Sequence, residues 1–424
     1  MPAPAVVTIP MSMNIGAPAK PVVKPGDEVK VGQLIAEAGG FVSSPIHSSV
    51  SGKVKRLDET LLAGGQTCQT VVIETDGLQT PWEGIAPPQV DSFEDFISAV
   101  RASGAVGLGG AGFPTAVKLN VDPAKVDYVC INGAECEPYI TADTRTMVDD
   151  DELLAEGIAL LQKYLQPGKV LIGIEKNKPQ CISGLKDVTG DLPGVDVITL
   201  PSLYPQGGEK VLIYHLTGRV VPEGKLPIDA GCVVVNPTTL VAIARYIKTG
   251  MPLVEKYVTV DGSAIAHPMN VIAPIGASVR DVVEFTGGTK CDVRKVIFGG
   301  LMMGVSMPSM DEVVMKNTNA ILCLDEADAT PPDPTPCIKC GRCISHCPLN
   351  LMPANIETAF KLNKPEELKA LKVNLCMECG CCSFICPARR PLVQTHKLAK
   401  AMLNKYNAEQ KAAAEKAKAK EATK

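Results

Sequence analysis

The feature that most constrains this chain is a cysteine pattern that occurs twice near its C-terminal end. Each copy has the spacing C-x2-C-x2-C-x3-C and is followed directly by proline. The first copy consists of Cys337, Cys340, Cys343 and Cys347, and the second of Cys376, Cys379, Cys382 and Cys386. Gaps of two residues let a short loop wrap three thiolates round one centre, and the proline stops the local helix. The segment is therefore expected to fold around two compact groups of thiolates.

This spacing is typical of two cubane [4Fe–4S] clusters, with the fourth cysteine of each run crossing to the other cluster. One cluster is then expected on Cys337, Cys340, Cys343 and Cys386, and the other on Cys376, Cys379, Cys382 and Cys347. Structural zinc is the alternative, but zinc ribbons use two C-x2-C pairs separated by a longer gap. Cys381 does not belong to either four-cysteine run and is interpreted as a small packed residue. The pattern predicts a protein that moves single electrons.

Length and composition exclude several other classes. The 424 residues suffice for about three domains, and 46% of them are hydrophobic, as in ordinary globular proteins. The formal net charge of −4 gives no sign of nucleic-acid binding. No stretch approaches the roughly 18 apolar residues of a membrane span, and the N-terminus lacks the pattern of a secretory signal. The cysteine usage favours a reducing cytosol over a disulfide framework.

Residues 1–88 are predicted to form a β domain, because turn signals such as Pro25-Gly26-Asp27 separate short apolar runs. Residues 22–55 resemble the barrel-sandwich family of biotinyl and lipoyl carriers. In that family a lysine on an exposed hairpin takes the cofactor, but the corresponding residues 44–49 here read SPIHSS. The resemblance therefore implies a docking module rather than a carrier, with His47 as a surface or packing residue.

Residues 89–250 alternate between helical and strand patterns, which implies a mainly parallel sheet with helices on its faces. Helices are predicted over residues 91–103, 150–165, 179–185, 209–216 and 238–248. Strands are predicted over residues 126–131, 170–174, 195–200 and 233–235.

A glycine-rich loop, GLGGAGFPT at residues 107–115, lies near the start of this region. Its glycines let backbone N–H groups come close to a phosphate or a flat ring. The loop contains G-x-G-x-x-G, but the dinucleotide fingerprint needs a strand directly before it, and an amphipathic helix is predicted there. A glycine-rich loop packed for shape alone is the alternative.

Other polar segments are predicted to lie near this loop. Lys118 follows the loop and can meet a phosphate, and Gly207-Gly208-Glu209 opens a helix, where anions bind. The segment NGAECEP, residues 132–138, follows one predicted strand, and Asn236 follows another. Because ligands bind at the carboxyl edge of a parallel sheet, these segments predict one shared site.

The same segments resemble the flavin- and NADH-binding subunit of respiratory complex I. That family has a GxGGAGFPT loop followed by lysine, an NxxExEP segment, a G-E turn and an asparagine before a helix. The resemblance implies that FMN binds at Gly107, Gly109, Gly110, Gly112, Lys118, Asn132, Glu135, Gly208, Glu209, Asn236 and Thr238. It also implies that Phe113 and Glu137 flank the nicotinamide. This chain has Ala134 and Lys210 at two positions where the family has acids, and both differences concern the NADH contacts.

Residues 251–325 are similar to the soluble-ligand-binding β-grasp family, with two strands and a helix over residues 278–285. The proline-rich residues 331–336 are a stiff linker into a ferredoxin-like module at residues 326–395, and residues 396–424 are a charged tail. The predicted fold is therefore a multidomain α/β and α+β chain. Its parts are a barrel-sandwich, a flavin domain over residues 89–250, a β-grasp and a two-cluster ferredoxin module.

In this order the domains resemble the RnfC family of electron-transport proteins over nearly the whole chain. The stretches GLGGAGFPTAVKL, NGAECEPYITADTR, YPQGGEK, GGLMMG, CIKCGRC and CMECGCC carry the resemblance. It implies a peripheral component on the cytoplasmic face of the cell membrane, which passes electrons between NADH, FMN, two [4Fe–4S] clusters and ferredoxin. The implied partners are the membrane subunits of an Rnf complex and its ferredoxin-like RnfB protein, which couple electron flow to Na⁺ or H⁺ transport.

Two other functions stay open on the sequence. A soluble flavin and iron–sulfur cobalamin reductase has a similar domain order and the same motifs. Copurification with membrane subunits would distinguish an Rnf protein from such a reductase. A non-enzymatic electron relay would hold clusters but no flavin, and the flavin absorbance discriminates that alternative.

Overall fold

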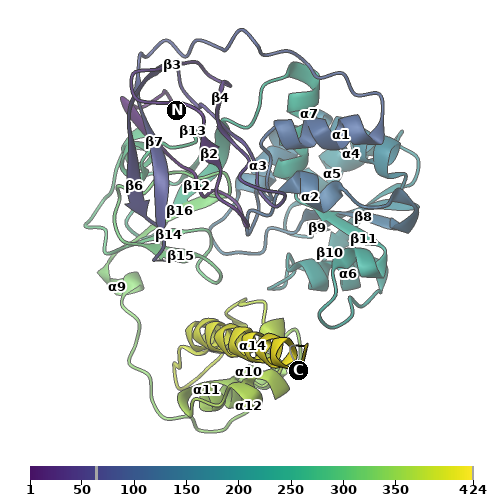
Figure 1. Ribbon diagram of the computed structural model, residues 1–424, viewed down its shortest axis with the longest axis vertical. Coiled ribbons are helices and arrows are strands. Elements are labelled where there is room, and N and C mark those ends of the chain that lie inside the picture. Colours follow the sequence, from purple (N-terminus) through teal and green to yellow (C-terminus); the bar gives the residue numbers. More distant parts are fainter. Residues whose placement is uncertain (63–64, 423–424) are drawn as a thin grey trace. The chain divides into compact units, whose positions relative to one another are not determined.

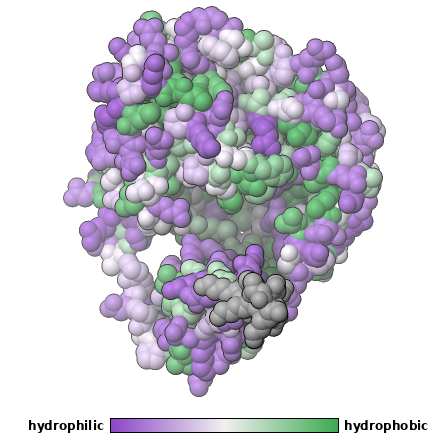
Figure 2. All heavy atoms as spheres, in the orientation of Figure 1, coloured by the Kyte–Doolittle hydropathy of each residue, from purple (hydrophilic) through white to green (hydrophobic). Residues whose placement is uncertain are grey.

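The computed structural model describes residues 1–62 and 65–422. It divides into two compact units, Met1–Ala329 and Thr330–Lys424 (Figure 1). The first unit contains all of the described β-sheets, and the second is built from short helices and one long helix. Polar residues cover most of the face shown in Figure 2.

The N-terminal region consists of two small antiparallel sheets, as predicted. Their strand orders are β1-β7-β6-β3 and β2-β4-β5. The strands are β1 (Val6–Pro10), β2 (Lys20–Pro21), β3 (Glu28–Val29), β4 (Leu34–Glu37), β5 (Ile46–His47), β6 (Gly52–Leu61) and β7 (Thr67–Thr75). Alternation along β1 buries Val7 and Ile9 in a core shared with Ile35 and Ile73.

The hairpin region that corresponds to the carrier lysine is buried rather than exposed. The Ser44 hydroxyl donates to the carbonyl of Gly104 (3.0 Å), and the Ser49 hydroxyl donates to that of Ile275 (2.5 Å). His47 is also buried, and this burial lowers its pKa to about 3. The hairpin therefore docks onto other parts of the first unit, and His47 is a packing residue.

The middle of the first unit is a parallel sheet of order β10-β9-β8-β11. Its strands are β8 (Tyr128–Gly133), β9 (Lys169–Glu175), β10 (Val195–Leu200) and β11 (Cys232–Val235). Its helices are α1 (Phe93–Ala102), α2 (Thr115–Leu119), α3 (Ala142–Asp149), α4 (Asp151–Leu165), α5 (Pro179–Thr189), α6 (Glu209–Thr217) and α7 (Pro237–Thr249), with 3-10 turns at Pro123–Lys125 and Pro227–Ala230.

Strand alternation divides the side chains of this sheet between two layers. Val129 and Ile131 pack with α1, α4, α5 and α7, whereas Cys130 and Cys232 pack with α6. The predicted strand over residues 126–131 in fact reaches Gly133, so Asn132 lies within β8. Helix α3 was not predicted, because five of its eight side chains are polar and its apolar positions show no clear period.

The third region is a mixed five-stranded sheet of order β13-β12-β16-β14-β15. Its elements are β12 (Glu255–Asp261), β13 (Met269–Pro274), α8 (Val279–Phe285), β14 (Lys295–Phe298), β15 (Val305–Met307), β16 (Ala320–Leu324) and α9 (Glu326–Ala329). The hairpin β12–β13 and helix α8 occupy the predicted segments.

The second unit comprises α10 (Arg342–Ser345), α11 (Pro353–Lys361), α12 (Pro365–Ala370), a 3-10 turn at Val373–Leu375, α13 (Cys381–Phe384) and α14 (Leu392–Ala422). Helix α14 packs on α11 and α12. Its residues His396, Ala399 and Leu403 are buried, so the predicted start of a tail at residue 396 falls inside a packed helix. Within the described residues, no helix is both long and apolar enough to span a bilayer.

Candidate cofactor sites

The glycine-rich loop is held in shape by backbone hydrogen bonds and by two distant segments. The amide of Gly107 donates to the carbonyl of Phe113 (2.9 Å). The amide of Ile15 donates to the carbonyl of Gly112 (3.0 Å), and the Asn317 side-chain amide donates to that of Gly110 (3.2 Å). The barrel-sandwich and the segment before β16 therefore both fix the loop.

The glycines of this loop leave room that side chains would fill. A Cβ at Gly109 would lie 2.3 Å from the side-chain nitrogen of Asn236, so only glycine fits there. A Cβ at Gly110 would meet nothing within 4 Å, so this residue borders open space. The loop thus offers exposed backbone beside a polar side chain, which suits close approach of a flat or anionic group.

The predicted polar segments meet at the carboxyl edge of β8 and β11. The Asn132 side-chain amide donates to the carbonyl of Gly207 (2.9 Å), and a Cβ at Gly207 would lie 2.4 Å from the carbonyl oxygen of Ala134. The ammonium of Lys118 donates to Glu209 Oε1 (3.0 Å) and to the carbonyl of Val234 (3.2 Å). These contacts bring the glycine turn before α6, the end of β8 and Lys118 together.

Asp143, which the sequence reasoning did not single out, connects two predicted site residues. Its carboxylate accepts hydrogen bonds from the side-chain amide of Asn236 (2.7 Å) and the hydroxyl of Thr238 (2.6 Å). Asp143 is buried in the first turn of α3. Because α3 itself was not predicted, no sequence signal indicated that this acid reaches α7.

The Glu135 side chain is held by the first turn of α3. Its carboxylate accepts from the amide of Asp143 (2.8 Å) and from the amide (3.1 Å) and hydroxyl (2.6 Å) of Thr144, and so caps the start of α3. Burial, and then the neighbouring Asp143, raise the pKa of Glu135 to about 7. The ammonium of Lys178 lies 4.0 Å from its Oε2 and donates to its backbone carbonyl (2.7 Å). Both oxygens are occupied, so Glu135 positions α3.

Lys256 places a buried amine near the same acids. It lies on β12 and is 1% exposed, and among the described residues its Nζ has no hydrogen-bond partner. Burial lowers the pKa of Lys256 to about 8, while the charges of Asp143 and Glu135 oppose this change. The β-grasp region thus contributes a charge to the neighbourhood of the flavin-domain acids.

Glu137 joins the end of the β8 segment to a loop of the β-grasp region. Its carboxylate accepts from the amides of Met302 (3.0 Å) and Met303 (2.9 Å) and from the hydroxyl of Tyr204 (3.3 Å). Burial raises its pKa. Phe113 is half-buried on the glycine-rich loop. Glu137 therefore connects the flavin-domain region to the β-grasp region.

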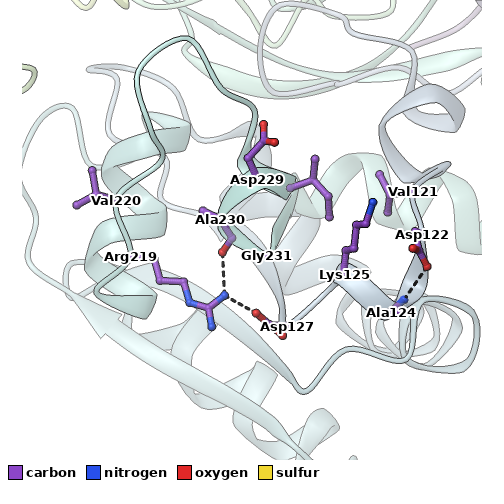
Figure 3. Close-up of a pocket in the computed structure, with 11 residues that line it drawn as sticks. Val121, Asp122, Ala124, Lys125, Asp127, Arg219, Val220, Asp229, Ala230 and Gly231 are labelled. Atoms are coloured by element: carbon purple, nitrogen blue, oxygen red, sulfur yellow. Dashed lines mark hydrogen bonds and ion pairs between the residues drawn. The ribbon is translucent and has the colours of Figure 1, made fainter.

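A depression lies at the opposite, amino edge of the sheet (Figure 3). Arg219 donates to Asp127 Oδ2 (2.5 Å) and to the carbonyl of Ala230 (2.8 Å) across its floor. Lys125 and Asp229 also line it. None of the residues predicted to bind FMN or NADH belongs to this depression, and its lining carries charges of both signs.

In the second unit, cysteines from both runs line one cavity. Cys347 of the first run lies there with Cys376, Cys379 and Cys382 of the second. The same wall contains Cys381 and the buried His396, whose Nδ1 is 3.5 Å from the sulfur of Cys376. This is the grouping that crossed ligation requires.

Three of the remaining cysteines of the two runs lie close together. Burial raises the pKa of Cys343, and the nearby thiols of Cys386 and Cys337 add to this change. Arg390 lies beside the latter two thiols and is itself paired with the buried Glu357 (Nε to Oε2, 2.7 Å). Cys340 is exposed. Across the described residues, no three His, Cys, Asp or Glu side chains are grouped as a single metal ion needs.

Comparison with known proteins identifies three domains within the first unit. Family models match the RnfC barrel sandwich hybrid domain at residues 1–78, the Nuo51 FMN-binding domain at residues 100–245 and the SLBB domain at residues 257–306. The C component of the Na⁺-translocating ferredoxin:NAD⁺ oxidoreductase complex of Acetobacterium woodii is 45% identical over 94% of this chain and 90% of its own length. The chain belongs to the RnfC family.

Other members have related descriptions. The C component of the proton-translocating ferredoxin:NAD⁺ oxidoreductase complex of Clostridium ljungdahlii is 42% identical over 87% of this chain and 81% of its own length. The corresponding protein of the ion-translocating oxidoreductase complex of Pseudomonas aeruginosa is 38% identical over 85% of this chain but only 47% of its own, longer sequence. None of these descriptions favours the alternative of a soluble cobalamin reductase.

Among solved structures, the fold is similar to a chain of an NAD⁺-reducing [NiFe]-hydrogenase in the H₂-reduced state. The TM-score is 0.52 at 19% identity, over 74% of this chain and 63% of that one. At this identity the likeness concerns the fold alone. The duplicated cysteine run lies outside the residues that the three family models match.

Proposed function

We propose that this RnfC-family chain is the NADH-oxidising or NAD⁺-reducing subunit of a membrane ferredoxin:NAD⁺ oxidoreductase complex. The observation that carries the proposal is the convergence of the glycine-rich loop, residues 132–137, residues 207–209 and Asn236 at one sheet edge. The relatives from Acetobacterium woodii and Clostridium ljungdahlii are described as subunits of ferredoxin:NAD⁺ oxidoreductase complexes.

FMN is the cofactor that these residues fit. The backbone at Gly107, Gly109, Gly110 and Gly112 would approach it, and Lys118, paired with Glu209, is the cation available for its phosphate. Asn132, Gly208, Asn236 and Thr238 would complete the wall, with Asp143 fixing the last two. A bound flavin exchanges electrons in pairs with NADH and singly with iron–sulfur clusters. The residues supply binding, orientation and charge.

The NADH side would be bordered by Phe113 and Glu137. Glu137 uses both carboxylate oxygens to hold the amides of Met302 and Met303. We therefore assign it the role of fixing the loop at residues 299–304 beside the flavin, in place of a direct reaction with NADH. Glu135 has the corresponding role toward α3.

Two [4Fe–4S] clusters would be held with crossed ligands. Cys337, Cys340, Cys343 and Cys386 would bind the first cluster, and Cys376, Cys379, Cys382 and Cys347 the second. The shared cavity of the second set supports this assignment, as does the proximity of Cys343 to Cys337 and Cys386. The clusters would give the chain a path for single electrons toward ferredoxin.

The partners follow from the family. Membrane subunits of an Rnf complex would translocate Na⁺ or H⁺, and its ferredoxin-like RnfB protein would exchange electrons with the second unit of this chain. The chain would then sit at the cytoplasmic face of the cell membrane, attached through these partners.

A cofactor inventory of the purified full-length protein tests the proposal. We expect FMN, iron and acid-labile sulfide, and we expect Lys118→Ala to lower flavin retention without loss of iron. Cys347→Ala should damage the cluster of Cys376, Cys379 and Cys382, as followed by iron content and paramagnetic resonance. Released FAD would contradict the FMN site, clusters without any flavin would indicate an electron relay, and damage to the other cluster would contradict crossed ligation.

A further inference from the structure

The two cysteine runs share a backbone conformation but differ at one informative position. Lys339 and Glu378 occupy equivalent places and both have left-handed backbones, with φ of 56° and 60°. The glycines that follow, Gly341 and Gly380, have φ of 75° and 81° and precede α10 and α13. The first residue of these helices is an arginine, Arg342, in the first run and Cys381 in the second.

Cys381 lies among the expected ligands of the second cluster. It lines the same cavity as Cys347, Cys376, Cys379 and Cys382. The thiols of Cys379, Cys382 and Cys347 are close enough to act on its charge. Cys381 therefore lies beside the sulfurs that would surround this cluster, which a small packing residue has no need to do.

We propose that Cys381 is a fifth thiol of the second cluster site and ligates iron in place of Cys379 when Cys379 is lost. The inference rests on the proposed [4Fe–4S] clusters. In the exchange, the Cys381 thiol gives its proton to solvent and its thiolate forms the iron–sulfur bond that Cys379 would have made, with no change in electron count. With Cys379 bound to the cluster as a thiolate, it has no proton to donate, so the Cys381 thiol would be the donor of any hydrogen bond between the two sulfurs. The first site has no such reserve, because the guanidinium of Arg342 carries no lone pair for a metal.

The chain contains a matched control for this proposal. Cys379 and Cys340 are the second cysteines of their runs, and only Cys379 has a thiol two residues later. The full-length protein is reconstituted without oxygen using ferrous iron and sulfide, and iron and acid-labile sulfide are counted per chain. The wild-type protein should hold about eight iron atoms, as two cubane clusters require.

Cys379→Ala should retain nearly the wild-type iron content, whereas Cys340→Ala should lose up to half of it. The double variant Cys379→Ala/Cys381→Ala should lose as much as Cys340→Ala. Equal losses in Cys379→Ala and Cys340→Ala would overturn the proposal, and so would a double variant that keeps its iron. A wild-type protein without iron would instead refute the clusters themselves, so the two failures are distinguishable.

Cys381→Ala provides a measurement that does not depend on losing a ligand. Its iron content should equal that of the wild-type protein. Because a hydrogen bond to a ligating sulfur raises the reduction potential of a cluster, the midpoint of one cluster should fall. An unchanged midpoint for both clusters, measured by redox titration with paramagnetic resonance, would show that the Cys381 thiol does not reach the cluster.

Discussion

At the scale of single residues, Glu137 is assigned a positioning role, because its carboxylate holds two backbone amides of a neighbouring loop. Glu137→Ala leaves the amides of Met302 and Met303 without their acceptor, and we expect the unit to lose about 2 kcal/mol of unfolding free energy. Glu137→Gln keeps one acceptor oxygen and should lose less. In both variants NADH-driven reduction should fall while FMN stays bound.

Chemical unfolding and flavin-reduction rates measure these effects. Tyr204→Phe is the matched control, because it removes only the hydroxyl that donates to Glu137. An alanine variant as stable as the wild-type protein would mean that the loop at residues 299–304 is held by other contacts.

Glu135 should make the free energy of unfolding depend on pH. Its folded pKa is about 7, against an ordinary value of 4.5. Between these values the folded chain holds a proton that the unfolded chain has released. The resulting stability is fully present below pH 4.5 and is lost as the pH rises through 7. Since one pKa unit corresponds to about 1.4 kcal/mol, the change is on the order of 3 kcal/mol.

Urea unfolding at pH values from about 4.5 to about 7.5 tests this dependence. Glu135→Gln should flatten the curve in this window, whereas Glu156→Gln, at an exposed ion pair on α4, should leave its slope unchanged. A wild-type stability that rises across the window would contradict the assignment.

At the scale of elements, α14 has one face that is buried and another that is exposed. Leu403 is 2% exposed and packs with Ile356 and Leu368, whereas Leu398 on the same helix is 59% exposed. Leu403→Ala should therefore cost about 2–4 kcal/mol in the unfolding of the second unit. Leu398→Ala should cost less than about 0.5 kcal/mol. Thermal unfolding followed by circular dichroism compares them, and equal costs would argue against the packing of α14 on α11 and α12.

Some of these elements and contacts could be predicted from the sequence, and others could not. Runs such as residues 170–174 predicted β9, because a strand buried on both faces must be continuously apolar. The cysteine spacing predicted the grouping of Cys347 with the second run. By contrast, the apolar residues of α3 do not recur at helical spacing, so the contacts of Asp143 could not be predicted from the sequence. Lys256 lies in a strand where only tertiary packing reveals that its amine is buried near acids.

At the scale of the whole molecule, the proposed attachment through partner proteins can be tested on the isolated chain. Residues 408–424 contain lysine, alanine and glutamate but no aromatic residue or leucine. Such a segment can be drawn to anionic lipid by charge, but it has no apolar face to insert. The isolated chain should therefore bind anionic vesicles weakly at low salt and release them at high salt, because salt screens exposed charges.

Flotation of the purified full-length protein with phosphatidylserine-containing vesicles measures this binding at low and at high ionic strength. A chain truncated after residue 407 is the control, and it should lose the weak low-salt binding while keeping both units folded, since the buried residues described on α14 end at Leu403. Vesicles of neutral lipid should float without protein at either salt concentration. Binding that persists at high salt would place an anchor in the chain itself, because hydrophobic insertion does not weaken as ionic strength rises.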